Sequence, residues 1–428
     1  MEPTNCLSDF RGCEISGATP GALDAFEHAL ATFQSWRNGS DGYLAPALQD
    51  APSFVMAHVL QAYLYLASRD PVRVRRARPV LARLWQMPAN ARERLHLSAI
   101  AAILADDYEH AKALLGGLLT REPRDVLALQ VAHNLDYLTG DVARMSDRVA
   151  GVLPAWSSDM AGYHAVLAMH AFALEEGGQF ARAEEFAKQA LKLNPFDARA
   201  HHVMAHVFEA SERADAGLSW LNAHAAAWQP DTTVATHGWW HLALFHLERR
   251  EADAALALYD ARVRRERSTD VSDLIDASSL LWRVRLQGID VEARWTELAD
   301  AWDGHIDDGF CSFSDVHAML AFVGARDDAR ARRLELALAH SRRSTRHGET
   351  TRRLGLPACR ALMAHGRGDD GLAIALLASL PTRAHRLGGS HAQRDVLHLT
   401  LRHAIDRMRR PARRPSAARS AILEARLS

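Results

Sequence analysis

Histidines are concentrated in one stretch of this chain. Seven of the 23 fall between positions 201 and 246. Two pairs in this stretch are spaced four residues apart, His202 with His206 and His237 with His241. Side chains four apart lie on the same face of an α-helix. Each pair is therefore expected to present two imidazoles together.

Imidazoles that converge in this way allow three interpretations. They bind borderline metal ions such as zinc, with His202, His206, His237 and His241 as the ligand set. Alternatively, they act as general acid and base near neutral pH. Otherwise they fill a polar stripe and bond to one another, to backbone or to water. The His-Glu-x-x-His spacing of zinc proteases is absent from the sequence, and the spacing alone selects none of the three.

Further polar residues accompany the histidines. Glu209 follows His206 by three residues on the same helical face, and Trp240 precedes His241. Downstream, Asp276 shares a helical face with Ser279. The predicted catalytic set comprises His202, His206, His237, His241, Asp276, Asp315, His317 and His391. The predicted ligand-binding set comprises Glu209, Trp240, Gln393, Arg394 and Asp395.

Two of these segments also have a simple structural interpretation. Ser314 or Asp315 could cap a helix that begins there. Ser390 could likewise cap the helix after the turn at Gly388 and Gly389. That second segment also carries four functional side chains as far as Asp395, more than a turn requires. We therefore expect it to fold back against the histidine-rich region as a wall of a pocket.

The elements that must position these residues are helical. The segments Arg92–Asp125, His164–Asp197 and 198–231 each show two apolar helical patterns, with small residues at matching offsets. Short polar turns join them, and no strand pattern exceeds a few residues. The sequence predicts an all-α solenoid of tetratricopeptide-type antiparallel hairpins, about twenty helices in one unit over 21–428, after an irregular segment 1–20. First helices of successive hairpins line one concave surface, so the two histidine pairs should face each other.

Composition excludes several classes of function. The 428 residues carry a formal net charge of -1, which favours neither nucleic acid nor an anionic membrane. No apolar run is long enough for a membrane helix, and the first 19 residues lack the apolar core of a secretory signal. The basic stretch Arg407–Arg414 has no interleaved aromatic residues and is interpreted as a solvated loop.

The cysteines and the short motifs narrow the function further. Cys6, Cys13, Cys311 and Cys359 have neither zinc nor redox spacing, as expected for reduced thiols in a cytoplasmic protein. The sequence has no Gly-Lys pair for a phosphate-binding loop, no Gly-x-Ser-x-Gly elbow and no Cys-x-x-Cys pair.

Several segments together resemble one known family. In chain order they are Asp9–Gly12, the double-histidine helix at His201, Trp240–Phe245, Asp276–Arg283, Asp315–Met319, Leu356–Cys359 and Gly388–Asp395. On these segments the chain is similar to the tetratricopeptide repeat protein 38 family. The resemblance implies a helical-repeat fold. It implies no particular activity, but its segments coincide with the polar clusters described above.

The sequence leaves two functional hypotheses. In the first, the concave side forms a histidine-rich pocket that binds a small polar or anionic molecule. Arg394 would bind a carboxylate or phosphate there, and a histidine or carboxylate would act in hydrolysis or group transfer. In the second, the groove holds a peptide or protein as a scaffold. No cofactor is assigned apart from the possible zinc ion, and the sequence does not indicate an oligomeric state.

Overall fold

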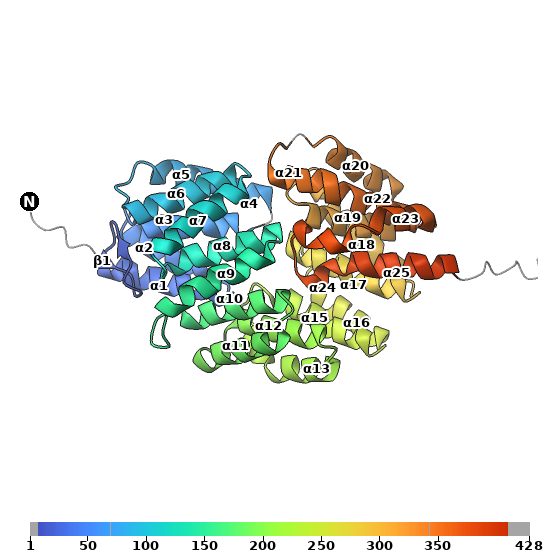
Figure 1. The fold of residues 1–428 in the computed structure, drawn as a ribbon, viewed down its shortest axis with the longest axis horizontal. Coiled ribbons are helices and arrows are strands. Elements are labelled where there is room, and N and C mark those ends of the chain that lie inside the picture. Colours follow the sequence, from blue (N-terminus) through green and yellow to red (C-terminus); the bar gives the residue numbers. More distant parts are fainter. Residues whose placement is uncertain (1–6, 69, 342, 410–428) are drawn as a thin grey trace, which may run out of the picture.

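The computed structural model describes residues 7–68, 70–341 and 343–409. Within these residues the chain is almost entirely helical and winds as a succession of antiparallel hairpins (Figure 1). The predicted all-α helical-repeat solenoid is therefore confirmed. None of the helices in the described part of the chain is both long and apolar enough to cross a membrane.

The described part of the chain begins with a small hairpin of two-residue strands. β1 (Leu7–Ser8) pairs antiparallel with β2 (Glu14–Ile15), within the segment expected to be irregular. The first helices are α1 (Pro20–Gln34), α2 (Ser40–Asp50), α3 (Val55–Leu66), α4 (Pro71–Arg75) and α5 (Ala77–Leu84).

Regular hairpins follow in the first half of the solenoid. They comprise α6 (Ala91–Leu104), α7 (Tyr108–Arg121), α8 (Val126–Thr139), α9 (Val142–Val152), the 3-10 turn η1 (Leu153–Ala155), α10 (Tyr163–Glu176), α11 (Phe180–Leu193), α12 (Ala198–Ala210), α13 (Ala214–Ala223) and α14 (Ala225–Trp228). The α6–α7 and α10–α11 hairpins and the α12–α14 unit occupy the three segments where the sequence pattern indicated repeats.

The second half continues in the same manner. It comprises α15 (Ala235–Glu248), α16 (Ala252–Leu258), the π-helical turn η2 (Tyr259–Val263), α17 (Val271–Leu286), α18 (Glu292–Trp302), η3 (Asp303–His305), α19 (Ser312–Gly324), α20 (Asp328–Ala339), α21 (Arg346–Thr350), η4 (Thr351–Gly355), α22 (Leu356–Gly366), α23 (Asp370–Leu377), η5 (Pro381–Leu387), α24 (His391–Arg394) and α25 (Val396–Arg409). The predicted loop at Arg407–Arg414 is helical as far as Arg409, and its remainder lies outside the described residues.

The helices form an inner and an outer layer. Successive inner helices pack on each other in the series α10, α12, α15, α17, α19, α22 and α25. Most of them bury residues on several sides because neighbours cover them, whereas α25 buries a single stripe. In α19, for example, every residue is buried. Outer helices such as α9 and α11 bury only one stripe of side chains, as expected for a helix with one face in water.

Aspartate side chains set where many of these helices begin. Their carboxylates accept hydrogen bonds from free N–H groups in the first turn. Asp125, for example, caps α8 and Asp197 caps α12, the helix that carries the first histidine pair. Other helices capped in this way are α7, α9, α20 and α23.

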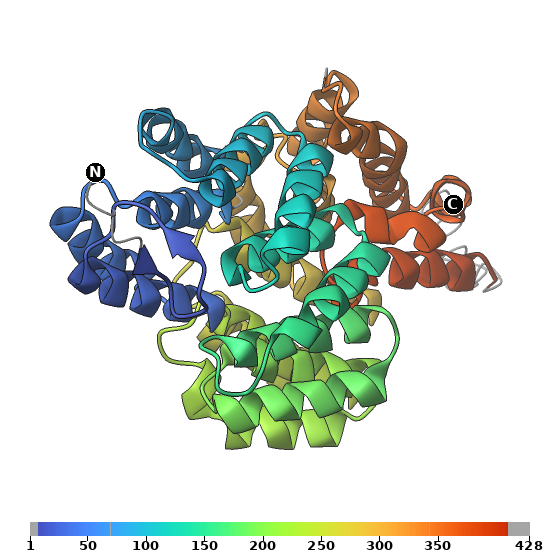
Figure 2. The ribbon, with the colours of Figure 1, turned by 60° about the vertical axis from the view of Figure 1, so that its left-hand side comes forward.

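The solenoid closes on itself, so that its last hairpins contact its first half. Figures 1 and 2 both show α8 beside the C-terminal helices, and α8 contacts η5. The hydroxyl of Tyr137 on α8 donates to Gln393 Oε1 at 3.3 Å. Gly140 lies directly against the carbonyl of His385, and Gly388 against the carbonyl of Leu138. We call this contact between Leu138–Gly140 and His385–Gly388 the closing seam.

A second contact ties the end of α1 to the middle of the chain. Arg37 forms a bridge with Thr232, and the backbone N–H of Asn38 donates to the carbonyl of Asp231 at 2.8 Å. Asn194 also donates to the hydroxyl of Ser35. The closing seam and this contact bring segments far apart in the chain together around the superhelical groove.

Candidate functional site

A cavity of about 720 Å³ lies inside the closed solenoid. This volume is within the range of small-molecule sites, about 300 to 1,000 Å³. Its walls come from all parts of the chain and include the aromatic side chains of Trp36, Tyr63, Tyr137 and Phe172. The polar side chains on its walls include Arg199, His202, His237, Asp276 and Gln393.

The four predicted histidines converge at one side of this cavity. His202 and His206 lie on α12, and His237 and His241 on the neighbouring α15. The Nε2 atoms of His202 and His206 are 2.8 Å apart. The ring centroids of His206 and His241 are 4.6 Å apart, and those of His202 and His237 are 4.8 Å apart. The structure therefore brings the two spaced pairs together, with His202 and His237 on the cavity wall.

Asp276 and Gln393 form a short chain of hydrogen bonds behind His237. The Nδ1 atom of His237 lies 2.8 Å from Asp276 Oδ2. The other carboxylate oxygen, Oδ1, accepts from Gln393 Nε2 at 2.9 Å. A carboxylate at Nδ1 favours the tautomer that carries its proton there. The Nε2 atom of His237 is thereby left to accept a proton or to coordinate a metal ion.

Burial controls the charge of the other histidines. It lowers the pKa values of His202, His206 and His241 well below the ordinary value for an imidazole, and the neighbouring imidazoles lower them further. A charged imidazole would have to leave water, and for His206 that cost outweighs the attraction of Glu175, 3.7 Å away. These three side chains are therefore neutral at pH 7.

Trp240 does not line the cavity. It is fully buried and stacks on His237, with ring centroids 4.9 Å apart and an interplanar angle of 16°. The guanidinium of Arg283 lies 5.7 Å from the centroid of the Trp240 ring. Trp240 was predicted to bind ligand, but its contacts are those of a side chain that holds His237 in place.

An acidic group lies beyond the histidines. Glu175 Oε2 is 3.7 Å from His206 Nδ1, and burial raises the pKa of Glu175 well above its ordinary value. Burial likewise raises the pKa of Glu209 to about 7, against the opposing effect of Arg283. Asp395 is among the neighbours that raise it. Glu209 and Asp395, both half-buried, therefore belong to the same acidic group, and neither lines the cavity.

Arg199 is a cavity residue that the sequence analysis did not select. It lies in the first turn of α12 with 1% of its surface exposed. Its guanidinium stacks over Trp36, 4.8 Å from the ring centroid. Within the described residues, none of its three side-chain nitrogens has a hydrogen-bond partner. Burial lowers its pKa to about 10, so Arg199 is still a cation at pH 7.

The segment 388–395 folds back against α12, as expected, because α24 contacts that helix. Ser390 caps α24, and Gln393 completes a reciprocal capping box with it. Gln393 thus stabilises the turn and also bonds Asp276. It is the residue of this segment that lines the cavity. The extra polar side chains are therefore partly structural, contrary to the expectation that the turn does not need them.

His391 and Arg394 do not reach the cavity. The His391 side chain is exposed, while its backbone N–H donates to Glu176 Oε1 at 2.8 Å. Arg394 pairs with the other oxygen of Glu176 at 3.0 Å and also donates to the carbonyl of Gly389. Arg394 was predicted to bind an anionic ligand. In the structure its guanidinium already has a carboxylate partner.

Asp315 and His317 also lie apart from the cavity. α19 begins at Ser312 with Cys311 as its cap residue. The capping interpretation of Ser314 and Asp315 is therefore wrong, because both lie inside the helix. Burial raises the pKa of Asp315 to about 7. His317 Nδ1 lies 2.8 Å from the carbonyl of Phe313, a bond within its own helix.

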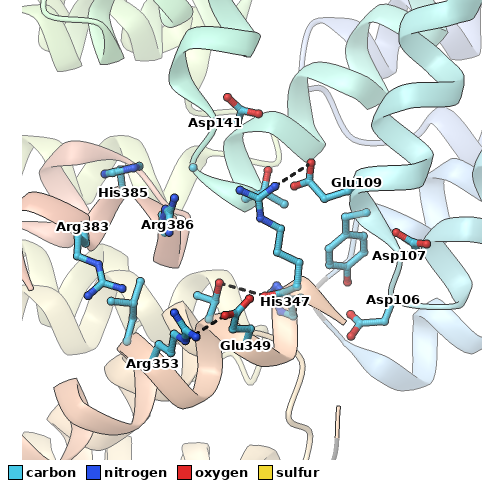
Figure 3. Close-up of a pocket in the computed structure, with 16 residues that line it drawn as sticks. Asp106, Asp107, Glu109, Asp141, His347, Glu349, Arg353, Arg383, His385 and Arg386 are labelled. Atoms are coloured by element: carbon cyan, nitrogen blue, oxygen red, sulfur yellow. Dashed lines mark hydrogen bonds and ion pairs between the residues drawn. The ribbon is translucent and has the colours of Figure 1, made fainter. Parts of the chain in front are cut away.

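A second, smaller pocket of about 250 Å³ lies beside the closing seam (Figure 3). Figure 3 shows Asp106 and Glu109 on one side of it and Arg353 and Arg383 on the other. Ion pairs and polar bonds cross or border this pocket, such as Arg346 with Glu109 at 3.6 Å. Some of its charges already have partners, such as Arg353 with Glu349 at 3.0 Å, and contacts such as that of Arg346 with Glu109 join the two halves of the solenoid.

Comparison with known proteins adds little beyond the fold. No family model matches the chain. Among solved structures, the chain is similar to a crystal structure of the TPR domain of P58(IPK), at 12% sequence identity and a TM-score of 0.21, over 91% of this chain and 99% of that chain. The resemblance to the tetratricopeptide repeat protein 38 family therefore stays a prediction from the sequence segments.

Proposed function

We propose that this helical-repeat protein binds a small organic anion inside its central cavity. The ligand would carry a carboxylate or phosphate that pairs with Arg199, and an apolar body that contacts the aromatic walls. The observation that carries the proposal is the unpaired guanidinium of Arg199, which is buried and lies on the cavity wall.

Burying a charged guanidinium without a partner is unfavourable, because it loses its hydration and gains nothing in exchange. Such a group is ordinarily paired with a carboxylate or phosphate, which its planar fork binds through two parallel bonds. Trp36 fixes the plane of the Arg199 guanidinium by stacking on it. An anion that enters the cavity would therefore meet a donor group that is already oriented.

The remaining walls suit the rest of such a molecule. Tyr63, Tyr137 and Phe172 supply aromatic surface, while His202 and Gln393 supply polar groups. A ligand pocket typically combines mostly apolar walls with a few oriented polar groups. A peptide-binding scaffold would instead need an open groove, and the contacts of the closing seam narrow this one.

The proposal is tested by calorimetric titration of the full chain. The probes are a panel of aromatic and aliphatic carboxylates and phosphate monoesters, each paired with its neutral amide or alcohol. We expect the anions to bind and the neutral analogues to bind at least tenfold more weakly. In Arg199→Met the best anion should lose about 100-fold in affinity, since a buried charge pair typically contributes 2–5 kcal/mol.

Arg148→Met is the matched control. Arg148 is also buried, but it pairs with Asp136 at 2.8 Å and does not line the cavity. Anion affinity should be the same in this variant as in the unmodified protein. Equal affinity in Arg199→Met and the unmodified protein would contradict the proposal, as would equal binding of anions and neutral analogues.

A further inference from the structure

The histidine cluster beside the cavity has a geometry of its own. One ring nitrogen from each of His202, His206, His237 and His241 lies within 4.8 Å of the corresponding atoms of the other three. The residues come from two rigid inner helices that pack against each other, two from each at a spacing of four. A ligand set held on helices keeps its shape better than one on loops.

The hydrogen bonds around the cluster indicate which nitrogen each ring would offer. His202 and His206 face each other through Nε2. The Nδ1 atom of His237 is bonded to Asp276, so its Nε2 atom is the one available. Among the described residues, neither ring nitrogen of His241 has a hydrogen-bond partner.

Carboxylates stand behind two of the rings. Asp276 bonds His237 and is itself held by Gln393. Glu175 lies 3.7 Å from the Nδ1 atom of His206. A histidine that binds metal ordinarily donates its other N–H to a carboxylate or carbonyl, which fixes the ring and strengthens it as a ligand. His237 and Asp276 have this arrangement.

Several buried nitrogens of the cluster lack a hydrogen-bond partner. In the part of the chain that the structure describes, these include Nδ1 of His202, Nδ1 of His206 and both nitrogens of His241. Buried polar atoms are ordinarily hydrogen-bonded. Each neutral imidazole has one N–H and one lone pair, and His237 directs its N–H to Asp276, so the lone pairs of the four rings outnumber the N–H groups left to them. A cation at their centre would use the lone pairs that have no donor.

We propose that His202, His206, His237 and His241 form a binding site for one divalent transition-metal ion of the zinc class. A set made only of imidazoles suits zinc, nickel or copper, whereas magnesium and calcium need oxygen ligands. Glu175, Glu176 and His206 form a second possible set. Glu176 is already engaged by Arg394 and by the His391 N–H, which favours the four histidines.

The test uses the full chain, stripped with a chelator and then dialysed against zinc. Elemental analysis should find one zinc ion per chain, and competition with a chromophoric chelator gives its affinity. His241→Asn should lose at least 100-fold in affinity, because it removes a direct ligand. Asp276→Asn should lose 10- to 100-fold, because it removes only the group that orients His237.

His403→Asn is the matched control. His403 and His365 also bring two ring nitrogens within 3.3 Å, but on α25 and α22, away from the cluster. Zinc affinity should be unchanged in this variant. The metal assay counts zinc and the calorimetric titration measures anion binding, so failure of the anion proposal and failure of the metal proposal give different results.

X-ray absorption of the zinc-loaded, unmodified protein keeps the test decisive even if His241→Asn does not fold. We expect a first shell of nitrogen alone at about 2.0–2.1 Å, with the multiple scattering typical of imidazole. Absence of stoichiometric zinc from the reloaded protein, a first shell containing sulfur or several carboxylates, or full affinity in folded His241→Asn would each overturn the proposal.

Discussion

Arg199 and Arg148 are both buried arginines, but only Arg148 has a carboxylate partner among the described residues. We therefore expect opposite effects when each is replaced by methionine. Arg199→Met should raise the free energy of unfolding by about 1 kcal/mol, because an unpaired charge leaves the interior. Arg148→Met should lower it by about 2–4 kcal/mol, because Asp136 loses its closest cation. Urea unfolding at pH 7 measures both free energies. A lower free energy of unfolding in Arg199→Met would show that the packing of Arg199 on Trp36 outweighs the cost of burying its charge.

Asp315 provides a pH-dependent prediction at the same scale. Burial raises its pKa to about 7, so the folded state holds a proton that the unfolded chain releases near pH 4. Stability must then fall as pH rises from about 4 to about 7. Asp315→Asn lacks this titration. Its free energy of unfolding should therefore rise relative to that of the unmodified protein as the pH increases from about 4 to about 7. The gain should reach at most about 4 kcal/mol above pH 7, since each pKa unit corresponds to about 1.4 kcal/mol.

The control for this prediction is Asp253→Asn, at an exposed position in α16. Its difference from the unmodified protein should be small and independent of pH. Unfolding free energies measured between pH 4.5 and pH 8 give both differences, and other titrating groups cancel because they are common to each pair. A gain in Asp315→Asn that stays constant over this range would contradict the raised pKa.

Residue spacing in the sequence predicts part of the site. The two pairs spaced by four do converge, and Asp276 does join them. Arg199 precedes His202 by three residues, so the same rule places it on their face. The residue type of Arg199 does not indicate a functional role, because a single arginine in a first helical turn is ordinarily solvated. Its importance follows from contacts with Trp36, far away in the sequence.

At the scale of elements, close packing between hairpins depends on small residues. Gly217 on α13 lies directly under the ring of the fully buried Phe245 on α15. Gly217→Ala should therefore lower the free energy of unfolding by about 1–3 kcal/mol, because the ring must move within a dense core. Thermal or urea unfolding measures the loss.

Gly151 on α9 is the matched position, since a side chain there would meet nothing within 4 Å. Gly151→Ala should raise stability by about 0.5–1 kcal/mol, because alanine has the better helix propensity. If both variants gained stability, α13 would not pack on α15 as closely as described.

Helices are predicted from this sequence more reliably than their ends. Apolar periodicity and small residues at matching offsets identify the hairpins α6–α7 and α10–α11. The beginning of α19 was misplaced, because the helix starts at Ser312 without a side-chain cap. The favourable cap residues Ser314 and Asp315 therefore lie inside it. Tertiary packing of a helix that is buried on all sides overrides the local capping signal.

At the scale of the whole molecule, closure depends on two glycines. Gly140 and Gly388 have φ angles of 66° and 80°, and each lies against a carbonyl across the closing seam. Gly140→Ala and Gly388→Ala should push the seam apart, because the added carbon cannot fit. X-ray scattering should then report a larger radius of gyration, and anion affinity should fall with the loss of enclosure.

Gly178 serves as the control for these two variants. Its φ of 76° imposes similar backbone strain, but no atom lies within 4 Å of an added side-chain carbon. Gly178→Ala should lose some stability and keep both the radius of gyration and the anion affinity. An unchanged radius in all three variants would mean that the seam does not hold the solenoid closed.

The closure could not have been predicted from the repeats. Periodicity reports contacts between neighbouring hairpins, whereas the seam joins short turns separated by more than 200 residues, such as those at Gly140 and His385. The sequence of such a turn does not indicate which distant turn it contacts. The sequence therefore predicts the solenoid and its histidine-rich inner face, whereas the cavity follows only from the three-dimensional packing.

The most direct test of an anion site in this cavity is crystallographic. Crystals of the full chain would be soaked with 6-bromo-2-naphthoate, and bromine would be located by anomalous diffraction. We expect one strong peak inside the cavity, with the carboxylate of the same molecule on the guanidinium of Arg199. Bromine found only on the outer surface or in the pocket of Figure 3, with Arg199 still unpaired, would contradict the account.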